Sequence, residues 1–301
     1  MTPIVKQYSL WAKSYAIENE RTVHHGKISR IGGVAIYLAF IISMALFVRT
    51  DQAFDGIVLG GSIMFFAGLI DDLIDMKPKV KLCFEIVAAI VLIYFGVSVD
   101  IIRLPFGITI DFGLITFLFT LIWVVGITNA VNLIDGLDGL AGGMSVIILV
   151  VIGSLAIIER RLDVVTITFI LAGSTFGFLF FNAHPASIFM GDCGSLFLGF
   201  MISAISLLGF KSSTILTLAL PTLLLMIPII DTLSAILRRT LKGMKFMQAD
   251  KSHLHHLLLS LQITMLLVRL RVRRLLQCSH MIQLSKLSMQ SILLRLVKIN
   301  S

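Results

Sequence analysis

The chain has 301 residues, of which 57% are hydrophobic and only 14% are charged, and its mean hydropathy is +0.98. This composition excludes an ordinary water-soluble domain and indicates a protein whose helices are surrounded by lipid. The formal net charge of +8 is typical of basic loops beside anionic lipid and gives little reason to expect nucleic acid as a partner.

Several apolar stretches are long enough to cross a bilayer, some only with their flanks, since a span needs about 20 mostly apolar residues. They are too long and too uniformly apolar for barrel strands, and a helix satisfies its own backbone hydrogen bonds in lipid. Residues 1–27 lack the apolar core of a cleavable signal peptide. We therefore predict an all-α, polytopic transmembrane helical bundle of about eight spans, at residues 31–48, 57–70, 82–99, 112–128, 140–158, 164–181, 195–210 and 215–237.

These crossings divide the loops into two sets on opposite faces of the membrane. The set that contains both the N-terminal segment and residues 238–260 holds 13 Lys or Arg, and the other set holds five. The excess of positive charge places the first set in the cytoplasm. Every polar motif falls in that same set, namely HHGKISR at 24–30, DDLID at 71–75, NAVNLIDGLD at 129–138, NAHPASIFMGDCGS at 182–195 and the segment 238–256.

Two adjacent carboxylates, Asp71 and Asp72, follow the second predicted span. Beside apolar surface they repel each other and make a site that attracts a divalent cation. An isolated pair of this kind is more simply a solvated helix end. The further carboxylates expected on the same face favour the cation site.

Asn132, Asp135 and Asp138 recur at three-residue spacing in NAVNLIDGLDGLAGG, so they can share a helical face. Amides and carboxylates at this spacing suit a hydrated magnesium ion or a polar nucleotide, whereas D-G pairs alone would mark only a turn. Asp192 directly precedes an apolar helix in FMGDCGS. There a carboxylate and the free amides of a helix N-terminus could hold a metal and a phosphate together, with a simple N-cap as the plainer alternative.

A cluster of three histidines, His253, His255 and His256, follows the last predicted span. Zinc would require a closed set of four ligands, and no cysteine lies nearby. Together with Arg238, Arg239 and Lys242, these histidines are better interpreted as donors to an anionic diphosphate.

Four motifs occur in a fixed order: GLIDD followed by KVK, NAVNLIDGLDGLAGG, PASIFMGDCGS and DKSHLHH. In this order they closely resemble the polyprenyl-phosphate N-acetylhexosamine-1-phosphate transferases, of glycosyltransferase 4 type, over residues 2–259. Within that family the chain looks most like the bacterial enzymes that transfer GlcNAc-1-phosphate from UDP-GlcNAc to undecaprenyl phosphate and so start teichoic acid or other surface glycans. The resemblance implies a Mg²⁺-dependent enzyme, with Mn²⁺ as an alternative ion, that works at the cytoplasmic face of the bacterial plasma membrane.

The resemblance also implies roles for single positions. Asp192 matches the family's magnesium-binding aspartate, and Asp71 matches a candidate base for the lipid phosphate that also faces the metal. Asn182 and Phe189 resemble the uridine pocket, Phe189 by stacking. Either Lys79 or Lys81 matches a family lysine. The implied catalytic set is Asp71, Asp72, Asp135 and Asp138, the metal set is Asp192 and Asp71, and the substrate-binding set is Asn132, Asn182, Phe189, Lys79, Lys81, Arg238, Arg239, His253, His255 and His256.

The implied reaction is attack by an oxygen of the lipid phosphate on the β-phosphorus of UDP-GlcNAc, with release of UMP. A lipid phosphate is already mostly ionised near pH 7, which favours direct attack. A two-step route through an aspartyl intermediate stays open.

The same resemblance assigns residues 1–260 to a transmembrane transferase domain that lacks the family's usual first helix. Residues 261–301 form an atypical tail with seven basic and no acidic residues. The tail is either a basic amphipathic helix lying on the membrane or the product of a reading frame shifted after about residue 260.

Three other interpretations stay open. The same chemistry could use another UDP-sugar, such as UDP-MurNAc-pentapeptide. A transporter would place ionisable groups near the bilayer midplane, whereas Glu85 and Asp231 lie toward the predicted cytoplasmic ends. The unusual ends of the chain would also suit an inactive membrane scaffold. Membrane lipids are expected partners in every case, and the sequence leaves the oligomeric state open.

Overall fold

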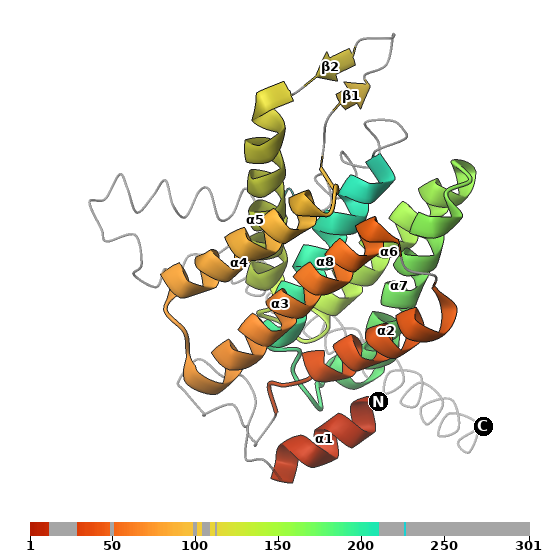
Figure 1. Ribbon diagram of the computed structural model, residues 1–301. Helices are drawn as coiled ribbons and strands as arrows, with labels where there is room; N and C mark the ends of the chain where they lie inside the picture. Colours follow the sequence, from red (N-terminus) through yellow and green to blue (C-terminus); the bar gives the residue numbers. More distant parts are fainter. Residues whose placement is uncertain are drawn as a thin grey trace, which may run out of the picture. The chain divides into compact units, whose positions relative to one another are not determined.

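A computed structural model describes residues 1–11, 29–48, 51–98, 101–103, 109–111, 113–210 and 226. The chain divides into two compact units, 1–230 and 231–301, and all of the described residues belong to the first. Figure 1 shows their elements, which are α1 (Thr2–Trp11), α2 (Gly33–Phe47), α3 (Gln52–Ile74), α4 (Pro78–Tyr94), β1 (Ile101–Arg103), β2 (Thr109–Asp111), η2 (Gly113–Ile115), α5 (Thr116–Ile134), α6 (Leu140–Ile158), α7 (Leu162–Asn182) and α8 (Asp192–Phe210).

The prediction of a polytopic helical bundle is confirmed. Among the described residues, five helices are long and apolar enough to cross a membrane, namely α3, α5, α6, α7 and α8, and α2 is a shorter apolar helix. Seven of the predicted spans correspond to α2 through α8. The eighth, at 215–237, lies outside the described residues except for Met226.

Three local features differ from the expectation. The N-terminal segment contains the helix α1, and an antiparallel hairpin pairs Ile101 with Asp111 in the loop after α4. The helix α4 ends at Tyr94 instead of continuing to residue 99. It stops because Gly96 takes a left-handed backbone (φ 79°) and its N–H and that of Val97 bond back to the carbonyls of the last turn, which closes the helix.

The helix α8 is the centre of this unit. Its span is 94% buried inside the protein, against 33–44% for the other four spans. It packs chiefly on α3 and α5, with further contacts to α2 and α6, and Figure 1 shows it among these helices. The other helices keep exposed apolar side chains such as Phe47, Phe66 and Phe180, as expected where lipid replaces water as the solvent.

Three helix ends meet around the first turn of α8. The C-terminal ends of α3 and α5 and the N-terminal end of α4 bring side chains to Asp192, the first residue of α8. Pro78 starts α4, where its missing N–H costs no hydrogen bond. The described residues of the motifs 71–75, 129–138 and 182–195 therefore lie at one end of the bundle, and the motif at 238–256 lies outside the described residues.

Candidate active site

The segment that leads into α8 is held by the backbone just before α2. Phe189 N–H donates to the carbonyl of Ser29 (2.8 Å), and the N–H groups of Gly32 and Gly33 donate to the carbonyls of Phe189 (3.0 Å) and Met190 (2.8 Å). These bonds fix the path of the chain between Phe189 and Asp192. Phe189 and Asp192, which the family resemblance assigns to the nucleotide and to the metal, are thus joined by one short segment whose backbone is fixed by these hydrogen bonds.

A cluster of charged side chains surrounds Asp192. Lys81 Nζ lies 2.6 Å from Asp192 Oδ2 and 2.8 Å from Asp71 Oδ2, so one ammonium group bridges the two carboxylates. Asn132 Nδ2 lies 3.5 Å from Asp192 Oδ2, and Asp71 Oδ1 accepts a hydrogen bond from Met76 N–H (2.7 Å). The cluster draws its members from α3, α4, α5 and α8.

The geometry distinguishes the two lysines that the sequence could not separate. Lys81 belongs to the carboxylate cluster, whereas Lys79 is exposed. Successive helical positions are about 100° apart, so residues two positions apart point to nearly opposite sides of the helix. Lys81 is therefore the lysine of α4 that faces the site.

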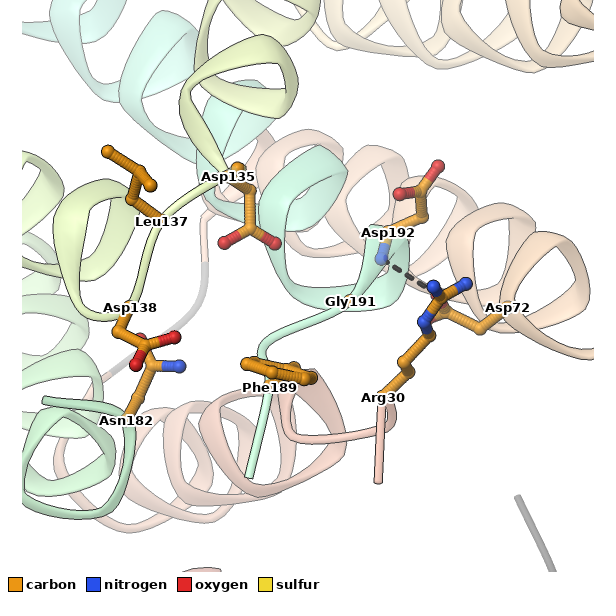
Figure 2. Close-up of a pocket in the computed structure, with 10 residues that line it drawn as sticks. Arg30, Asp72, Asp135, Leu137, Asp138, Asn182, Phe189, Gly191 and Asp192 are labelled. Atoms are coloured by element: carbon orange, nitrogen blue, oxygen red, sulfur yellow. Dashed lines mark hydrogen bonds between the residues drawn. The ribbon is translucent and has the colours of Figure 1, made fainter. Parts of the chain in front are cut away.

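Asp72 points away from that cluster and toward the backbone of α8. Its Oδ1 accepts from Asp192 N–H and its Oδ2 accepts from Cys193 N–H, both at 2.9 Å, and Figure 2 marks the first of these bonds. The neighbouring Gly191 has a left-handed backbone (φ 73°), and a Cβ there would collide with the carbonyl of Arg30 and lie 2.7 Å from the Asp72 carboxylate. Only glycine fits this position.

Two buried polar side chains connect the loop after α5 to the loop after α7. Asp138 Oδ2 accepts a hydrogen bond from Ala186 N–H (3.1 Å). Asn182 Oδ1 accepts from Gly139 N–H (3.1 Å), while its Nδ2 donates to the carbonyl of Ile188 (3.0 Å). These bonds hold the Asp-Gly loop at a fixed distance from Phe189.

A cavity of about 250 Å³ opens between these loops and α8. Figure 2 shows the Asp135 carboxylate pointing into it and the ring of Phe189 on another of its walls. Four aspartates line the cavity, and Arg30 is the one basic residue among its lining residues. The lining consists of Arg30, Asp72, Asp135, Gly136, Leu137, Asp138, Asn182, Phe189, Gly191 and Asp192.

Asp135 follows the last residue of α5 and is half-buried. Burial, together with the negative charges of Asp192 and Asp72, raises the pKa of this carboxyl from 3.8 to about 7. A carboxyl in this state can exchange a proton near neutral pH. It would also gain from a cation placed in the cavity.

The comparisons with known proteins agree with this geometry. Residues 54–210, slightly more than half of the chain, match the profile of Glycosyl transferase family 4. The chain belongs to this family. The family 4 match spans α3 through α8 and therefore contains the whole carboxylate cluster.

Three relatives of this family 4 protein cover most of its length. A probable undecaprenyl-phosphate N-acetylglucosaminyl 1-phosphate transferase from Bacillus subtilis is 40% identical over 263 residues, which cover 86% of this chain and 74% of the relative. A decaprenyl-phosphate N-acetylglucosaminephosphotransferase from Mycolicibacterium smegmatis is 34% identical, covering 82% and 68%. A phospho-N-acetylmuramoyl-pentapeptide-transferase from Listeria monocytogenes is 35% identical, covering 74% and 73%. The chain is thus a multi-pass membrane member of the polyprenyl-phosphate N-acetylhexosamine-1-phosphate transferases.

The donor atoms of the cluster fit a hard divalent cation. Carboxylate oxygens of Asp71 and Asp192 already lie within 2.8 Å of one cationic group, the Lys81 ammonium. The described part of the chain contains no group of three or more His, Cys, Asp or Glu arranged for a metal. Mg²⁺ suits such a place, because it is commonly bound by one or two carboxylates and completes its shell with water and substrate phosphate.

The predicted site residues divide into three groups. Asp71, Lys81, Asn132 and Asp192 form the cluster, and Asp72, Asp135, Asp138, Asn182 and Phe189 line the cavity. The third group belongs to neither place: Lys79 is exposed on α4, and Arg238, Arg239, His253, His255 and His256 lie outside the described part of the chain.

Sequence reasoning missed Arg30 as a cavity residue. It is the last residue of the HHGKISR motif, for which the sequence predicts the same set of loops as the other polar motifs but no chemical role. A single arginine that belongs to no periodic pattern of polar residues gives no indication of which other residues it lies near in the fold. Its place follows from the backbone bonds between residues 29–33 and 189–190, which link segments about 160 residues apart.

Proposed function

We propose that the chain transfers GlcNAc-1-phosphate from UDP-GlcNAc to undecaprenyl phosphate, giving undecaprenyl-diphosphate-GlcNAc and UMP. One observation carries the proposal: Asp192 lines the same cavity as Phe189, and its carboxylate belongs to the cluster with Asp71 and Lys81. A nucleotide in the cavity and a lipid phosphate at the cluster would then meet at Asp192. The names of the Bacillus and Mycolicibacterium relatives support GlcNAc as the sugar.

The donor would be held by groups of different chemistry. The Phe189 ring offers a flat apolar face on which the uracil base can stack. Arg30 supplies a planar cation suited to a phosphate of the diphosphate. Asp138 and Asn182 keep the Asp-Gly loop in place, so that the cavity keeps its width around the nucleotide.

The acceptor phosphate would lie next to Lys81. This ammonium neutralises charge as the two anionic substrates approach each other. An oxygen of the lipid phosphate forms a bond to the β-phosphorus of the donor, and the bond from that phosphorus to the oxygen of UMP breaks. Because the attacking phosphate is already ionised, the step requires no proton transfer, and the protein contributes positioning and charge neutralisation.

We also propose that Asp192 and Asp71 hold a magnesium ion, with Asn132 beside it and Asp135 facing the same space. Such an ion, when bound, would supply positive charge that offsets the negative charge of the diphosphate and of the departing UMP. Mn²⁺ would substitute, because both ions accept hard oxygen ligands.

The proposed site faces the cytoplasm, and the excess of Lys and Arg in the predicted loops on the same side of the membrane supports this orientation. The proposed product is the first lipid-linked intermediate of teichoic acid or a related surface glycan. We assign the activity to residues 1–260, and a chain that ends at residue 260 is expected to retain it.

The test is a transfer assay with the purified chain in detergent, where no ion gradient exists to drive a transporter. With undecaprenyl phosphate and Mg²⁺, we expect UMP release and a lipid-linked GlcNAc product by mass spectrometry from UDP-GlcNAc. UDP-MurNAc-pentapeptide in place of UDP-GlcNAc should give no product. Preference for the pentapeptide substrate would overturn the sugar assignment.

Two variants test the site. Asp192→Asn should abolish Mg²⁺-dependent product formation, whereas Asp55→Asn, in the first turn of α3 at its opposite end, should leave it unchanged. An Asp192→Asn variant with full activity would show that the cluster is not the active site. Absence of product from the unmodified chain would indicate an inactive relative.

A further inference from the structure

We propose that Asp72 is a positioning residue, whose carboxylate fixes the first turn of α8 and thereby holds Asp192 in place to bind the metal. The inference rests on the proposed function, because it takes Asp192 as a metal ligand. It separates the two adjacent aspartates of the GLIDD motif into different roles.

The N–H groups in the first turn of α8 need a hydrogen-bond acceptor that the residue preceding the helix cannot supply. The leading N–H groups of a helix have no partners within the helix, and a side chain at the preceding position usually accepts from one of them. Here the preceding residue is Gly191, and the carbonyl of Arg30 and the Asp72 carboxylate leave no room for a side chain. The cap must therefore come from another element.

Asp72 meets that need from α3. Its two carboxylate oxygens each accept one bond of 2.9 Å, from Asp192 N–H and from Cys193 N–H. A carboxylate at this place is also favoured by the positive end of the α8 dipole. Both oxygens are therefore committed to backbone groups.

The neighbouring Asp71 faces another direction. Its carboxylate contacts Lys81 and Met76 N–H, on the side of the charged cluster. Asp192 is thus held twice, by Asp72 at its backbone and by Lys81 and Asn132 at its side chain. A shift of the first turn of α8 would move the carboxylate away from Asp71, and the two could no longer share one ion.

The experiment uses Mn²⁺ as the probe, with its binding to the full purified chain measured by electron paramagnetic resonance. Asp72→Asn retains one acceptor oxygen but turns an NH₂ group toward a backbone N–H, so one bond of the cap is lost. We expect its Kd for Mn²⁺ to rise about tenfold or more. We also expect kcat to recover to within about threefold of the unmodified enzyme as Mg²⁺ is raised, because a positioning defect is overcome when the ion is forced to bind.

The matched control is Asp75→Asn. Asp75 is an exposed aspartate at the end of the same helix in a left-handed backbone conformation, which asparagine tolerates. It should leave the Kd and kcat unchanged. Hydrogen exchange of residues 188–196, measured by mass spectrometry, should be faster in Asp72→Asn alone.

Unchanged Mn²⁺ affinity together with a loss of kcat that no Mg²⁺ concentration restores would overturn the proposal and assign Asp72 to the chemical step. If Asp72→Asn does not yield folded protein, Asp72→Ser, whose hydroxyl can still accept one bond, takes its place. A separate variant tests the metal site of the proposed function. If Asp192→Asn binds Mn²⁺ with normal affinity, Asp192 is not a metal ligand, and this result does not depend on the role of Asp72.

Discussion

Replacing Lys81 with methionine tests whether its ammonium occupies the place that a divalent ion takes. Lys81, Asp71 and Asp192 have side chains that are 22%, 10% and 27% exposed, so their two ion pairs are only partly screened by water. Breaking a fully buried pair costs roughly 3–5 kcal/mol, and the partial exposure here lowers this to roughly 2–3 kcal/mol. The metal-free Lys81→Met protein should therefore melt several degrees lower than the unmodified protein.

The same change should tighten metal binding. In the unmodified protein an incoming ion must displace Lys81, whereas in Lys81→Met it meets two neighbouring carboxylates with no counter-charge. If the ion no longer has to break ion pairs worth about 1.4–2.8 kcal/mol, its Kd falls ten- to a hundredfold. Saturating Mg²⁺ should also restore most of the lost melting temperature. Turnover should fall, because the cation beside the acceptor phosphate is gone.

The assay is a titration with Mn²⁺ and Mg²⁺, read by electron paramagnetic resonance and by thermal unfolding in detergent. Lys79→Met is the matched control, since this lysine lies on the same helix but is exposed, and it should change neither quantity. Weaker or unchanged metal binding in Lys81→Met would refute the reasoning, because it would mean that Lys81 supports the ion site or does not compete for it.

Three further changes have distinct expected results. Arg30→Met should weaken UDP binding about tenfold or more in isothermal titration and leave uridine binding nearly unchanged; equal losses for both would place Arg30 away from the phosphates. The pKa of Asp135 is raised from 3.8 to about 7 in the folded protein. Between about pH 4 and pH 7 the folded state therefore keeps this proton while the unfolded state has lost it, so the free energy of unfolding decreases as the pH rises through this range. Asp135→Asn should therefore raise the melting temperature in EDTA at pH 8, by an amount worth at most roughly 4 kcal/mol, and change it little at pH 4; equal effects at both pH values would contradict the shift. Asn182→Ala leaves the half-buried Gly139 N–H and the buried Ile188 carbonyl without their partner, so it should cost roughly 1–3 kcal/mol of stability and lower uridine affinity. An unchanged melting temperature would show that these two bonds do not stabilise the loop.

Hydrophobic length and charge alone were enough to predict α2 through α8, although not the short helix α1, because a bilayer allows few alternatives for long apolar segments. Helix ends were harder. The fourth predicted span stops at residue 128, yet α5 continues to Ile134. The reason lies in the partners of its asparagines: Asn129 Nδ2 donates to Glu85 Oε2 (2.6 Å) and Asn132 reaches Asp192. These asparagines, which the sequence predicts to lie in a loop, form hydrogen bonds with side chains of neighbouring helices.

The composition of the site was also predictable, but the direction of each side chain was not. Asp71 and Asp72 were expected to act as one pair. Adjacent residues on a helix point about 100° apart, and only the packing of α3 between α4 and α8 decides which carboxylate meets which neighbour. The choice between Lys79 and Lys81 depends in the same way on the rotation of α4 about its axis. The sequence shows which residues share one side of a helix, but it does not show which side faces a given neighbouring helix.

The close approach of α3 to α8 explains why the site forms at this point of the bundle. A Cβ at Gly68, one helical turn before Asp72, would collide with the carbonyl oxygen of Asp192 and lie 2.6 Å from the Cα of Cys193. Without a side chain there, α3 approaches the first turn of α8 closely enough for Asp72 to accept two bonds from its backbone. Any larger residue at position 68 would push the helices apart, break the cap and separate Asp71 from Asp192. The metal site therefore depends on a residue that carries no functional group.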